Sequence, residues 1–398
     1  MTHTLISFLG RTPKGQSGYR KTRYRFADEF ETPETAFIGW SLCERLHPDR
    51  MVILGTSGSM WDYLVESIPL GDAGEAERLE LQEATENKAV TQSLLTQITP
   101  LLQSALGGEL KLLIIPYGQQ ENEQIELLQL MAEQVPPNAH VSLDVTHGFR
   151  HLPMLALMSA LHLRVTRNAQ IADIYYGAYD PDTGEAPIYD LSGLLRIADW
   201  VGALHTFDKD GDYGAFAPLL EQDGLSPSAV NYLRKAAYFE RTFNVTNART
   251  QLLGFATSLS AGLPGIGRLF DEQLEARTEW HKGSDTYARQ RELADFYLKQ
   301  RDYPRAAIFA FEAFLTNLIA RDAGEREFDY DDREHAEREF RAGNRGKPSL
   351  RKSFQRLEKL RNTLAHGNPS KDQQVQRIVK DEERLHQELL RLMKRLLN

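Results

Sequence analysis

The chain has 398 residues, enough for two or three domains, and its 41% hydrophobic and 26% charged residues are typical of a globular protein. Its formal net charge of −9 excludes a molecule that is basic all over, so any nucleic-acid-binding surface must be a local patch. The single cysteine, Cys43, excludes an internal disulfide and a cysteine-based zinc site, which is consistent with a reducing cytoplasm.

The first half of the chain predicts an α/β fold. Near-continuous apolar runs, typical of strands covered on both faces, lie at residues 4–10, 51–56, 111–118, 141–146 and 170–179. Helical patterns separate them at about residues 33–46, 74–107, 120–134 and 152–166, and Thr32 followed by Pro33 predicts a helix start. This alternation indicates a mostly parallel, Rossmann-like sheet. Residues 1–10 lack a signal-peptide pattern, and the longest apolar stretch, 152–165, is too short to cross a bilayer.

The second half of the chain predicts helices only. Residues 206–285 hold helical pieces between glycine- and proline-containing breaks, and we expect them to form a helical connector. From about residue 286 to the end the pattern is helical, with one charged interruption near residues 321–348. The predicted domains are therefore an α/β domain at residues 1–205, the connector at 206–285 and a helical domain at 286–398.

Polar and basic residues follow three of the predicted strands. Ligands of open α/β sheets bind beyond the carboxyl ends of the strands, so these residues are candidates for a binding pocket. A basic segment follows the first strand and a turn of glycines and hydroxyl side chains follows the second. The fourth strand leads through DVTHGFR into a helix whose N-terminus can hold a phosphate. The predicted pocket takes an anionic, nucleotide-like ligand and comprises Gly10, Arg11, Thr56, Ser57, Gly58, Ser59, Thr146, His147, Gly148, Phe149 and Arg150.

These residues also have structural interpretations. The glycines can serve only as turn residues, Asp144 can be a buried structural acid, and His147 can be structural rather than ligand-binding. The basic segment after Gly10 can be a solvated hairpin. The chain has no Walker A motif and no GxGxxG after a strand, so ATPase and dehydrogenase functions lose support. Residues 208–212 suggest a calcium loop, but glycine is not at its sixth position.

A helix near the C-terminus carries the main catalytic candidates. Its predicted start is Ser349, and Gly367 and Pro369 end it. The helical spacing forms one apolar stripe of Leu350, Phe354, Leu357, Leu360 and Leu364. Arg361 falls inside this stripe, where an arginine needs a buried partner or a function. His366 follows five residues later, at the end of the helix.

Arg361 and His366 fit metal-independent cleavage of RNA. The RNA supplies the 2′-hydroxyl nucleophile, a histidine moves protons, a guanidinium stabilises charge on the phosphoryl oxygens, and Asn362 can position a phosphate or hydroxyl. Five residues advance an ideal helix by about 7.5 Å and 140°, so two copies facing each other across a dimer axis would make a better composite site. Arginine–histidine pairs at this spacing also occur by chance, so the spacing alone is weak support.

The local charge strengthens the case for RNA. Between Arg341 and His366 the sequence has eight basic residues and one acid, Glu358, in a chain whose net charge is −9. Such a patch suits phosphates, although a solvated charged face is the alternative for its outer lysines. The candidate RNA-binding residues are Arg351, Lys352, Arg356 and Lys359.

The segment RNTLAHG at residues 361–367 resembles the Arg-x4-6-His signature of HEPN domains. Residues 293–320 resemble the first long helical pair of that fold, with Glu312 at a polar position on an apolar helix. The resemblance places catalytic roles on Arg361 and His366, and Asn362 matches the polar residue that often follows the arginine. It covers about the last 110 residues.

The first half resembles a CARF domain, the cyclic-oligoadenylate sensor of type III CRISPR systems. The resemblance rests on SFLG at 7–10, LGTSGS at 54–59 and DVTHGFR at 144–150. A CARF domain followed by a HEPN domain is similar to the CRISPR-associated ancillary ribonucleases of the Csx and Csm type. The middle of the chain, residues 206–285, matches nothing that we can name.

The resemblance implies a cytoplasmic, homodimeric endoribonuclease of antiviral defence that cleaves single-stranded RNA. Its allosteric activator would be a cyclic oligoadenylate, with cyclic tetra-adenylate the preferred ring, and it would need no cofactor and no metal. Two alternatives stay open. One is a non-catalytic sensor that dimerises through its C-terminal helices, and the other is a ribonuclease that also degrades its own activator.

Overall fold

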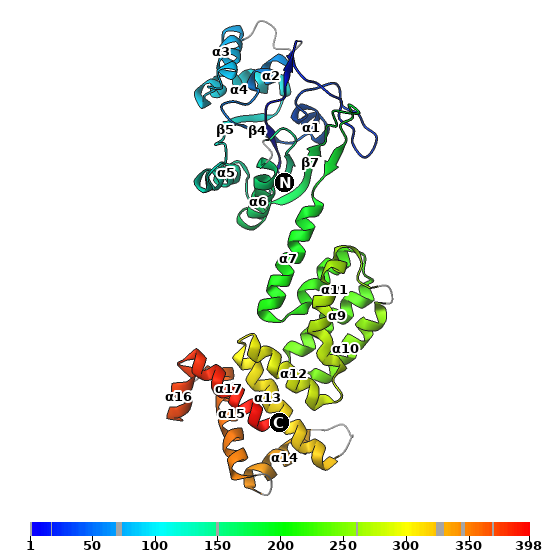
Figure 1. The fold of residues 1–398 in the computed structure, drawn as a ribbon, viewed down its shortest axis with the longest axis vertical. Coiled ribbons are helices and arrows are strands. Elements are labelled where there is room, and N and C mark those ends of the chain that lie inside the picture. Colours follow the sequence, from blue (N-terminus) through cyan, green and yellow to red (C-terminus); the bar gives the residue numbers. More distant parts are fainter. Residues whose placement is uncertain are drawn as a thin grey trace. The chain divides into compact units, whose positions relative to one another are not determined.

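The computed structural model describes residues 2–16, 18–68, 74–148, 151–259, 262–323, 330–343, 347–367 and 370–398. It consists of two compact units, unit 1 (Met1–Arg196) and unit 2 (Ile197–Asn398), which are coloured blue to green and green to red in Figure 1. Among the described residues, no helix has the length and apolar character needed to cross a bilayer.

Unit 1 is built on a six-stranded sheet in the order β5-β4-β1-β6-β7-β8. All neighbouring strands are parallel except β7 and β8, which are antiparallel. The predicted mostly parallel, Rossmann-like sheet is therefore confirmed, and β8 is an edge strand that the sequence pattern missed. The strands are β1 (His3–Leu9), β4 (Arg50–Gly55), β5 (Glu109–Ile114), β6 (His140–Asp144), β7 (Gln170–Gly177) and β8 (Ile188–Asp190).

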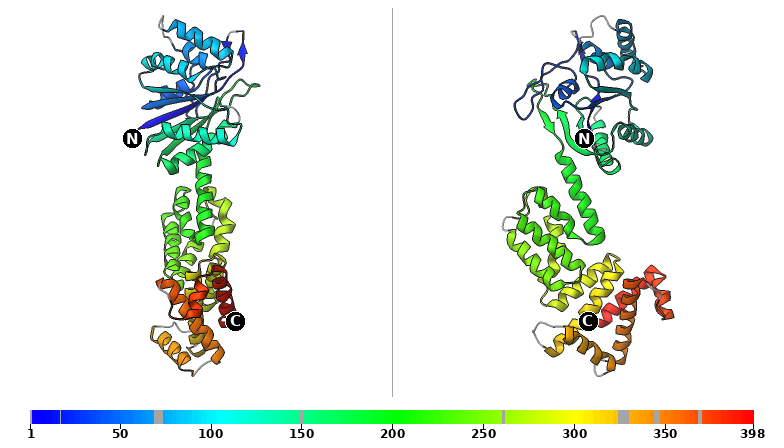
Figure 2. Two further views of the ribbon diagram at one scale, coloured as in Figure 1. Left: turned by 90° about the vertical axis from the view of Figure 1, so that its left-hand side faces the viewer. Right: turned by 180° about the vertical axis from the view of Figure 1, so that it is seen from behind.

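Helices cover both faces of the sheet, as Figure 2 shows. Alternate residues of β1 explain this arrangement, because Leu5 and Leu9 enter one buried core while Ile6 and Phe8 enter the other. Side chains of α1–α4 fill the first core and those of α5 and α6 the second. The helices are α1 (Gly39–Leu46), α2 (Trp61–Glu66), α3 (Glu75–Glu86), α4 (Gln92–Leu106), α5 (Glu121–Gln134) and α6 (Leu152–Thr166).

Two local predictions in unit 1 are wrong. Residues 74–107 form two helices rather than one, because the side chain of Thr91 caps a new helix by accepting from Leu94 N. No helix starts at Thr32 and Pro33. Thr32 instead pairs with Tyr24 in an extended loop, where its amide donates to the Tyr24 carbonyl and its Oγ1 accepts from the Tyr24 amide, both at 2.9 Å. The loop also holds a small hairpin, β2 (Lys14–Gly15) and β3 (Gly18–Tyr19).

Unit 2 is helical throughout its described residues and has one hydrophobic core. The strongest pairings join α12 with α13 and α9 with α10, followed by α13 with α15 and α15 with α17. Its elements after α7 are η1 (Tyr213–Phe216), α8 (Ala217–Gln222), α9 (Pro227–Arg241), α10 (Val245–Ser258), η2 (Gly265–Phe270), α11 (Asp271–Thr278), η3 (Glu279–Lys282), α12 (Thr286–Lys299), α13 (Tyr303–Ala323), α14 (Tyr330–Ala342), α15 (Pro348–His366), α16 (Gln373–Val379) and α17 (Glu382–Leu396).

The expected boundary at residue 205 falls inside α7 (Gly193–Asp210). This helix contributes Leu195 to the core of unit 1, and Trp200 and Phe207 to the core of unit 2. The expected connector, residues 206–285, shares its core with the helices that follow it. It is therefore packed into unit 2 and does not form a separate layer.

Candidate functional site

A pocket of about 190 Å³ opens in unit 1 beyond the carboxyl ends of β1, β6 and β7. In this sheet β1 lies between β4 and β6, so the pocket is at the point where the strand order reverses, which is the usual ligand position in such folds. Its lining comes from three segments: Arg11, Thr12, Pro13, Arg20, Thr22 and Tyr24 after β1, Thr146, His147 and Gly148 after β6, and Gly177 and Tyr179 at the end of β7.

Asp144 has a structural role at the end of β6. Its side chain is fully buried, and it accepts hydrogen bonds from Ser7 Oγ on the neighbouring strand and from Thr146 N at 3.0 Å. Burial raises the pKa of this carboxyl group. The two contacts fix the turn that presents residues 146–148 to the pocket, so Asp144 acts beneath the pocket and not within it.

His147 is an uncharged residue of the pocket lining. The Ile38 amide donates to its Nε2 at 3.3 Å, so this nitrogen is an acceptor and the ring proton lies on Nδ1. Burial lowers the pKa of His147 to about 4. A Cβ on Gly10 would stand 1.5 Å from the His147 carbonyl oxygen, so only glycine fits at position 10. His147 and Gly10 therefore shape the pocket floor without carrying charge.

The charge in the pocket comes from Arg11 and Arg20. Arg11 donates to the carbonyl oxygens of Gly58 at 3.4 Å and Thr85 at 3.3 Å. The Arg20 guanidinium lies 4.1 Å from the centre of the Tyr179 ring. None of the lining residues that the structure describes is acidic. Burial raises the pKa of Tyr24, whose phenol therefore stays protonated and can donate. The lining offers cations, aromatic faces and donors together.

The predicted pocket residues divide into two groups. Arg11, Thr146, His147 and Gly148 line the pocket, and Gly10 contacts His147 directly beneath it. The turn at residues 56–59 does not line it. Ser59 Oγ points inward and donates to the Leu9 carbonyl at 2.6 Å, the Ser57 carbonyl accepts from Val90 N, and the Gly58 carbonyl holds Arg11. Thr56 is buried, with its amide bound to Ser59 Oγ. Phe149 and Arg150 lie outside the described residues.

Sequence reasoning missed several lining residues. Arg20 was visible only as a member of the basic segment, and Thr22, Tyr24, Gly177 and Tyr179 carried no signal. These residues come together because the loop after β1 pairs with the start of β8. Arg25 N donates to the Ala186 carbonyl at 3.0 Å, and Ile188 N donates to the Arg25 carbonyl at 2.8 Å.

A second candidate site lies on α15 of unit 2. The apolar stripe is confirmed, because Phe354, Leu357 and Leu360 are buried against the core. Arg361 is half-buried beside it, with its guanidinium 4.1 Å from the centre of the Phe311 ring on α13. Its Nε is buried and has no hydrogen-bond partner among the described residues. A buried guanidinium nitrogen without an acceptor is costly unless another anionic or polar group meets it.

His366 is the last residue of α15 and is exposed, as is Asn362 one turn earlier. The helix ends because Gly367 adopts the left-handed conformation, with φ of 64°. Arg361 packs against α13 while His366 is open to solvent, so a single α15 offers a half-buried guanidinium and an exposed imidazole on one helix end.

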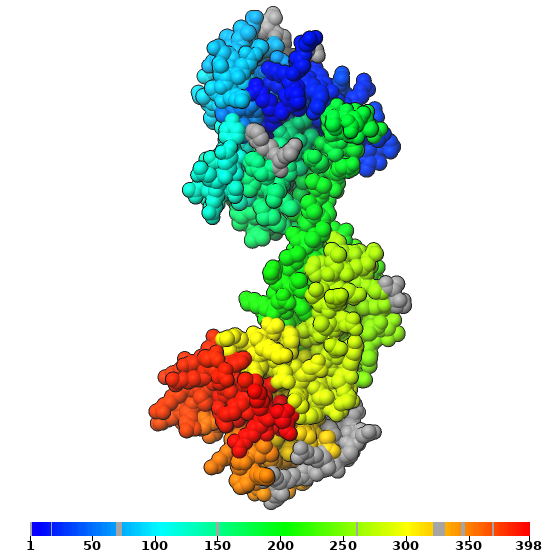
Figure 3. Space-filling view, in the orientation of Figure 1, coloured from blue at the N-terminus to red at the C-terminus, as the bar shows by residue number. Residues whose placement is uncertain are grey.

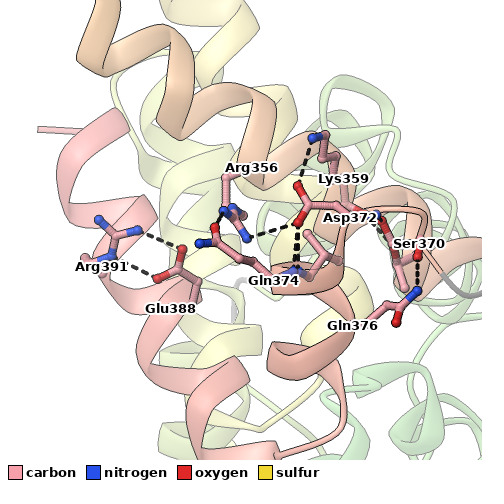
Figure 4. Close-up of polar contacts among 10 residues, drawn as sticks. Arg356, Lys359, Ser370, Asp372, Gln374, Gln376, Glu388 and Arg391 are labelled. Atoms are coloured by element: carbon pink, nitrogen blue, oxygen red, sulfur yellow. Dashed lines mark hydrogen bonds and ion pairs between the residues drawn. The ribbon is translucent and has the colours of Figure 1, made fainter.

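The basic patch is partly neutralised in space. Arg341 pairs with Glu337 and Glu358, and Lys359 Nζ lies 2.9 Å from Asp372 Oδ2. Arg356 binds Gln374 and lies 3.9 Å from Asp372, as Figure 4 shows. Of the other two predicted RNA-binding residues, Arg351 donates to the Gly343 carbonyl and Lys352 is exposed. Arg345, a further basic residue of the patch, is outside the described residues. The sequence window ended at His366 and so missed Asp372. Segments α15–α17 are orange to red in Figure 3.

Comparisons with known proteins support the resemblance of the N-terminal half to a CARF domain. Residues 4–181 match the family described as "CRISPR system endoribonuclease Csx1, CARF domain". The chain is similar to "CRISPR-associated protein MJ1674" of Methanocaldococcus jannaschii, with 28% identity over 247 residues. That match spans 56% of this chain and 39% of the relative.

A solved structure of Enterococcus italicus Csm6, bound to cyclic hexa-2′-fluoro-hexa-dAMP, aligns with this chain at 13% identity and a TM-score of 0.36. The alignment covers 99% of this chain and 95% of that one.

Proposed function

We propose that residues 4–181, which match the Csx1 CARF family, form a CARF domain, and that the chain is a ribonuclease of type III CRISPR antiviral defence. In this proposal a cyclic oligoadenylate binds the pocket of unit 1, and α15 of a homodimer then cleaves single-stranded RNA without a metal. The observation that carries the proposal is the pocket beyond β1, β6 and β7, which is lined by two arginines and by no acidic residue among those described.

The pocket chemistry fits a cyclic oligoadenylate. Guanidinium groups such as those of Arg11 and Arg20 bind phosphates through charge-assisted hydrogen bonds. The Tyr179 ring beside Arg20 can pack against a purine base, and Tyr24, Thr22 and Thr146 add hydroxyl groups to the lining. A ring of adenylates has phosphates on its inside and bases around it, so a dimer with two such pockets would hold it symmetrically. Cyclic tetra-adenylate remains our preferred ring.

The proposed cleavage uses only groups on α15 and the RNA. The 2′-hydroxyl oxygen attacks the adjacent phosphorus, the bond to the 5′ oxygen breaks, and the products are a 2′,3′-cyclic phosphate and a 5′-hydroxyl. One His366 accepts the proton of the 2′-hydroxyl while His366 of the partner subunit gives one to the departing oxygen. Arg361 stabilises the charge on the phosphoryl oxygens through its half-buried guanidinium group. Asn362 positions a phosphate or hydroxyl.

An exposed apolar stripe on α6 supports the homodimer. Met154, Met158 and Val165 lie on one side of this helix and are 72%, 49% and 86% exposed. Such a surface is unusual on a monomer. Because α6 begins shortly after the pocket residues 146–148, a second copy on this stripe would place the two pockets near the two-fold axis.

Replacing Met158 with aspartate should weaken the dimer at least about tenfold, because a carboxylate would then be buried in the apolar interface. Sedimentation velocity over a concentration series measures the dissociation constant. Leu79 on α3 is the matched control, since it is an isolated apolar residue that is 62% exposed. If Met158→Asp and Leu79→Asp dimerise like the original chain, the α6 interface is refuted.

Ribonuclease activity should persist in excess EDTA, because histidine and arginine supply the proton transfer and the charge stabilisation. The measurement is the cleavage rate of labelled RNA with saturating activator, before and after chelation and gel filtration. A loss that Mg²⁺ or Mn²⁺ restores would contradict the metal-independent mechanism.

The test of the whole proposal is an assay of purified protein with labelled single-stranded RNA and each cyclic oligoadenylate in turn. We expect cleavage only when one ring size is present. Ring binding without cleavage would favour the non-catalytic sensor. Loss of the ring during incubation with the His366→Ala protein would show that unit 1 also degrades its activator.

A further inference from the structure

Asp372 occupies the basic surface of α15. Its Oδ2 lies 2.9 Å from Lys359 Nζ, and its Oδ1 lies 3.9 Å from Arg356 Nη1. Figure 4 shows this carboxylate facing both cations from the segment that follows α15. Lys359 and Arg356 are two of the four cations expected to contact RNA, so one acid neutralises half of that set.

The position of Asp372 is fixed by the start of α16. Its Oδ1 accepts from Gln374 N at 2.9 Å and from Val375 N at 3.3 Å, which makes it the N-cap of the helix. Its own amide donates to Ser370 Oγ at 3.1 Å. Val375 is fully buried in the core of unit 2 and holds α16 in place. The carboxylate is therefore presented to α15 by a structured segment.

Asp372 stays charged whenever the protein is folded near neutral pH. The hydrogen bond from Lys359, together with those from the backbone amides, lowers the pKa of the Asp372 carboxyl to about 2. The carboxylate therefore competes for Lys359 and Arg356 at every pH at which the ribonuclease would work.

We propose that Asp372 stands in for an RNA phosphate in the free protein, and that the RNA backbone must displace it from Lys359 and Arg356 to bind along α15. The inference rests on the proposed function, since it takes α15 as the RNA-binding helix. A carboxylate offers the same oxygens to a guanidinium or ammonium group as a phosphate does.

The strength of these contacts decides the size of the effect. The Lys359 side chain is 51% exposed and that of Asp372 is 22% exposed, and ion pairs of this kind are weak and screened by salt. Asp372 therefore lowers RNA affinity by a moderate factor and does not block the surface. Because of Asp372, the RNA affinity of the free protein is lower than the number of basic residues on α15 suggests.

The test replaces Asp372 with asparagine, which caps a helix as well as aspartate but carries no charge. RNA that cannot be cleaved, with 2′-O-methyl groups, is titrated while its fluorescence anisotropy is recorded. We expect about fivefold tighter binding at 0.1 M salt from the release of two weakly paired cations. The plot of log affinity against log salt should steepen by about 0.7 to 1.4, as one or two more phosphates are neutralised.

Asp381 is the matched control. It caps α17 by accepting from Arg384 N at 3.0 Å and pairs with Arg384 at 3.3 Å, so Asp381→Asn removes the same charge from the same kind of position. We expect this variant to bind RNA like the original chain. Equal tightening by both variants would reduce the effect to net charge and overturn the proposal. Melting temperatures verify folding, and Asp372→Ser, also a good cap, replaces Asp372→Asn if that variant does not fold.

Lys359→Gln separates this proposal from the function on which it rests. Weaker binding by Lys359→Gln with unchanged or weaker binding by Asp372→Asn would overturn the role of Asp372 and leave α15 as the RNA-binding helix. If neither variant changes the affinity, both the role of Asp372 and the RNA surface are wrong. Failure to cleave RNA with any cyclic oligoadenylate would instead contradict the proposed function, whatever the affinities.

Discussion

Replacing His366 with alanine should lower the rate of RNA cleavage at least about 100-fold, the usual contribution of a general acid–base group. The proposed mechanism gives His366 both proton transfers, and His366 is the only histidine on α15. The side chain is exposed at the end of α15, and Gly367 terminates the helix, so the substitution should leave the fold intact. Single-turnover cleavage of labelled RNA measures the expected loss. The affinity for the cyclic oligoadenylate is measured in parallel and should not change.

His335 on α14 provides the control for this experiment, because it is another exposed histidine of unit 2. His335→Ala should cleave RNA at the original rate. Cleavage that survives in His366→Ala removes α15 from the active site. A parallel loss of melting temperature and activity in both variants would point to damage to the helical unit instead.

Charge reversal at Arg20 should weaken binding of the cyclic oligoadenylate by about 100-fold or more. The Arg20→Glu change removes a charge-assisted hydrogen bond, worth about 1.5–3 kcal/mol, and adds repulsion between a carboxylate and a phosphate. Arg20 is exposed at the pocket and contacts Tyr179, so the core does not depend on it. The affinity is measured by isothermal titration calorimetry, and the cleavage rate at saturating ligand should be close to the original.

Arg23 lies in the same loop, is exposed and does not line the pocket. Arg23→Glu therefore tests whether the general field of the loop, rather than the pocket contact, attracts the ligand. We expect its affinity to fall by much less than that of Arg20→Glu. Equal losses in the two variants would argue against the pocket as the binding site.

The alternation of apolar strands and helices was enough to predict the sheet, because parallel strands buried on both faces read as continuous apolar runs. β8 has only three residues, Ile188–Asp190, two of them exposed, and so lacked that signal. The error at Thr32 has a similar cause. Threonine followed by proline is a local signal for the start of a helix. Here the β-bridges between Thr22 and Thr35 and between Arg25 and Glu31 hold the segment in an extended conformation instead.

Site residues were predictable where they follow a strand directly. Arg11, Thr146, His147 and Gly148 come within a few residues of β1 or β6, so the topology fixes their position. Tyr24 reaches the pocket only through the folded path of a long loop. Asp372 is separated from Lys359 by the end of α15, so a window of local charge could not reveal that the two groups meet.

The continuity of α7 limits how unit 1 can be exchanged between related chains. One helix carries Leu195 for the first core, and Trp200, which stacks on Phe216 and Phe270, for the second. At its C-terminal end, the Asp210 carbonyl accepts a hydrogen bond from Arg305, and the carbonyl of Gly211, which follows the helix, accepts one from Arg277. A chimaera joined at residue 205 would therefore take Trp200 from one parent and its aromatic neighbours from the other. The joint that keeps each core with its own residues lies between 195 and 200, a span of about one and a half turns of the helix.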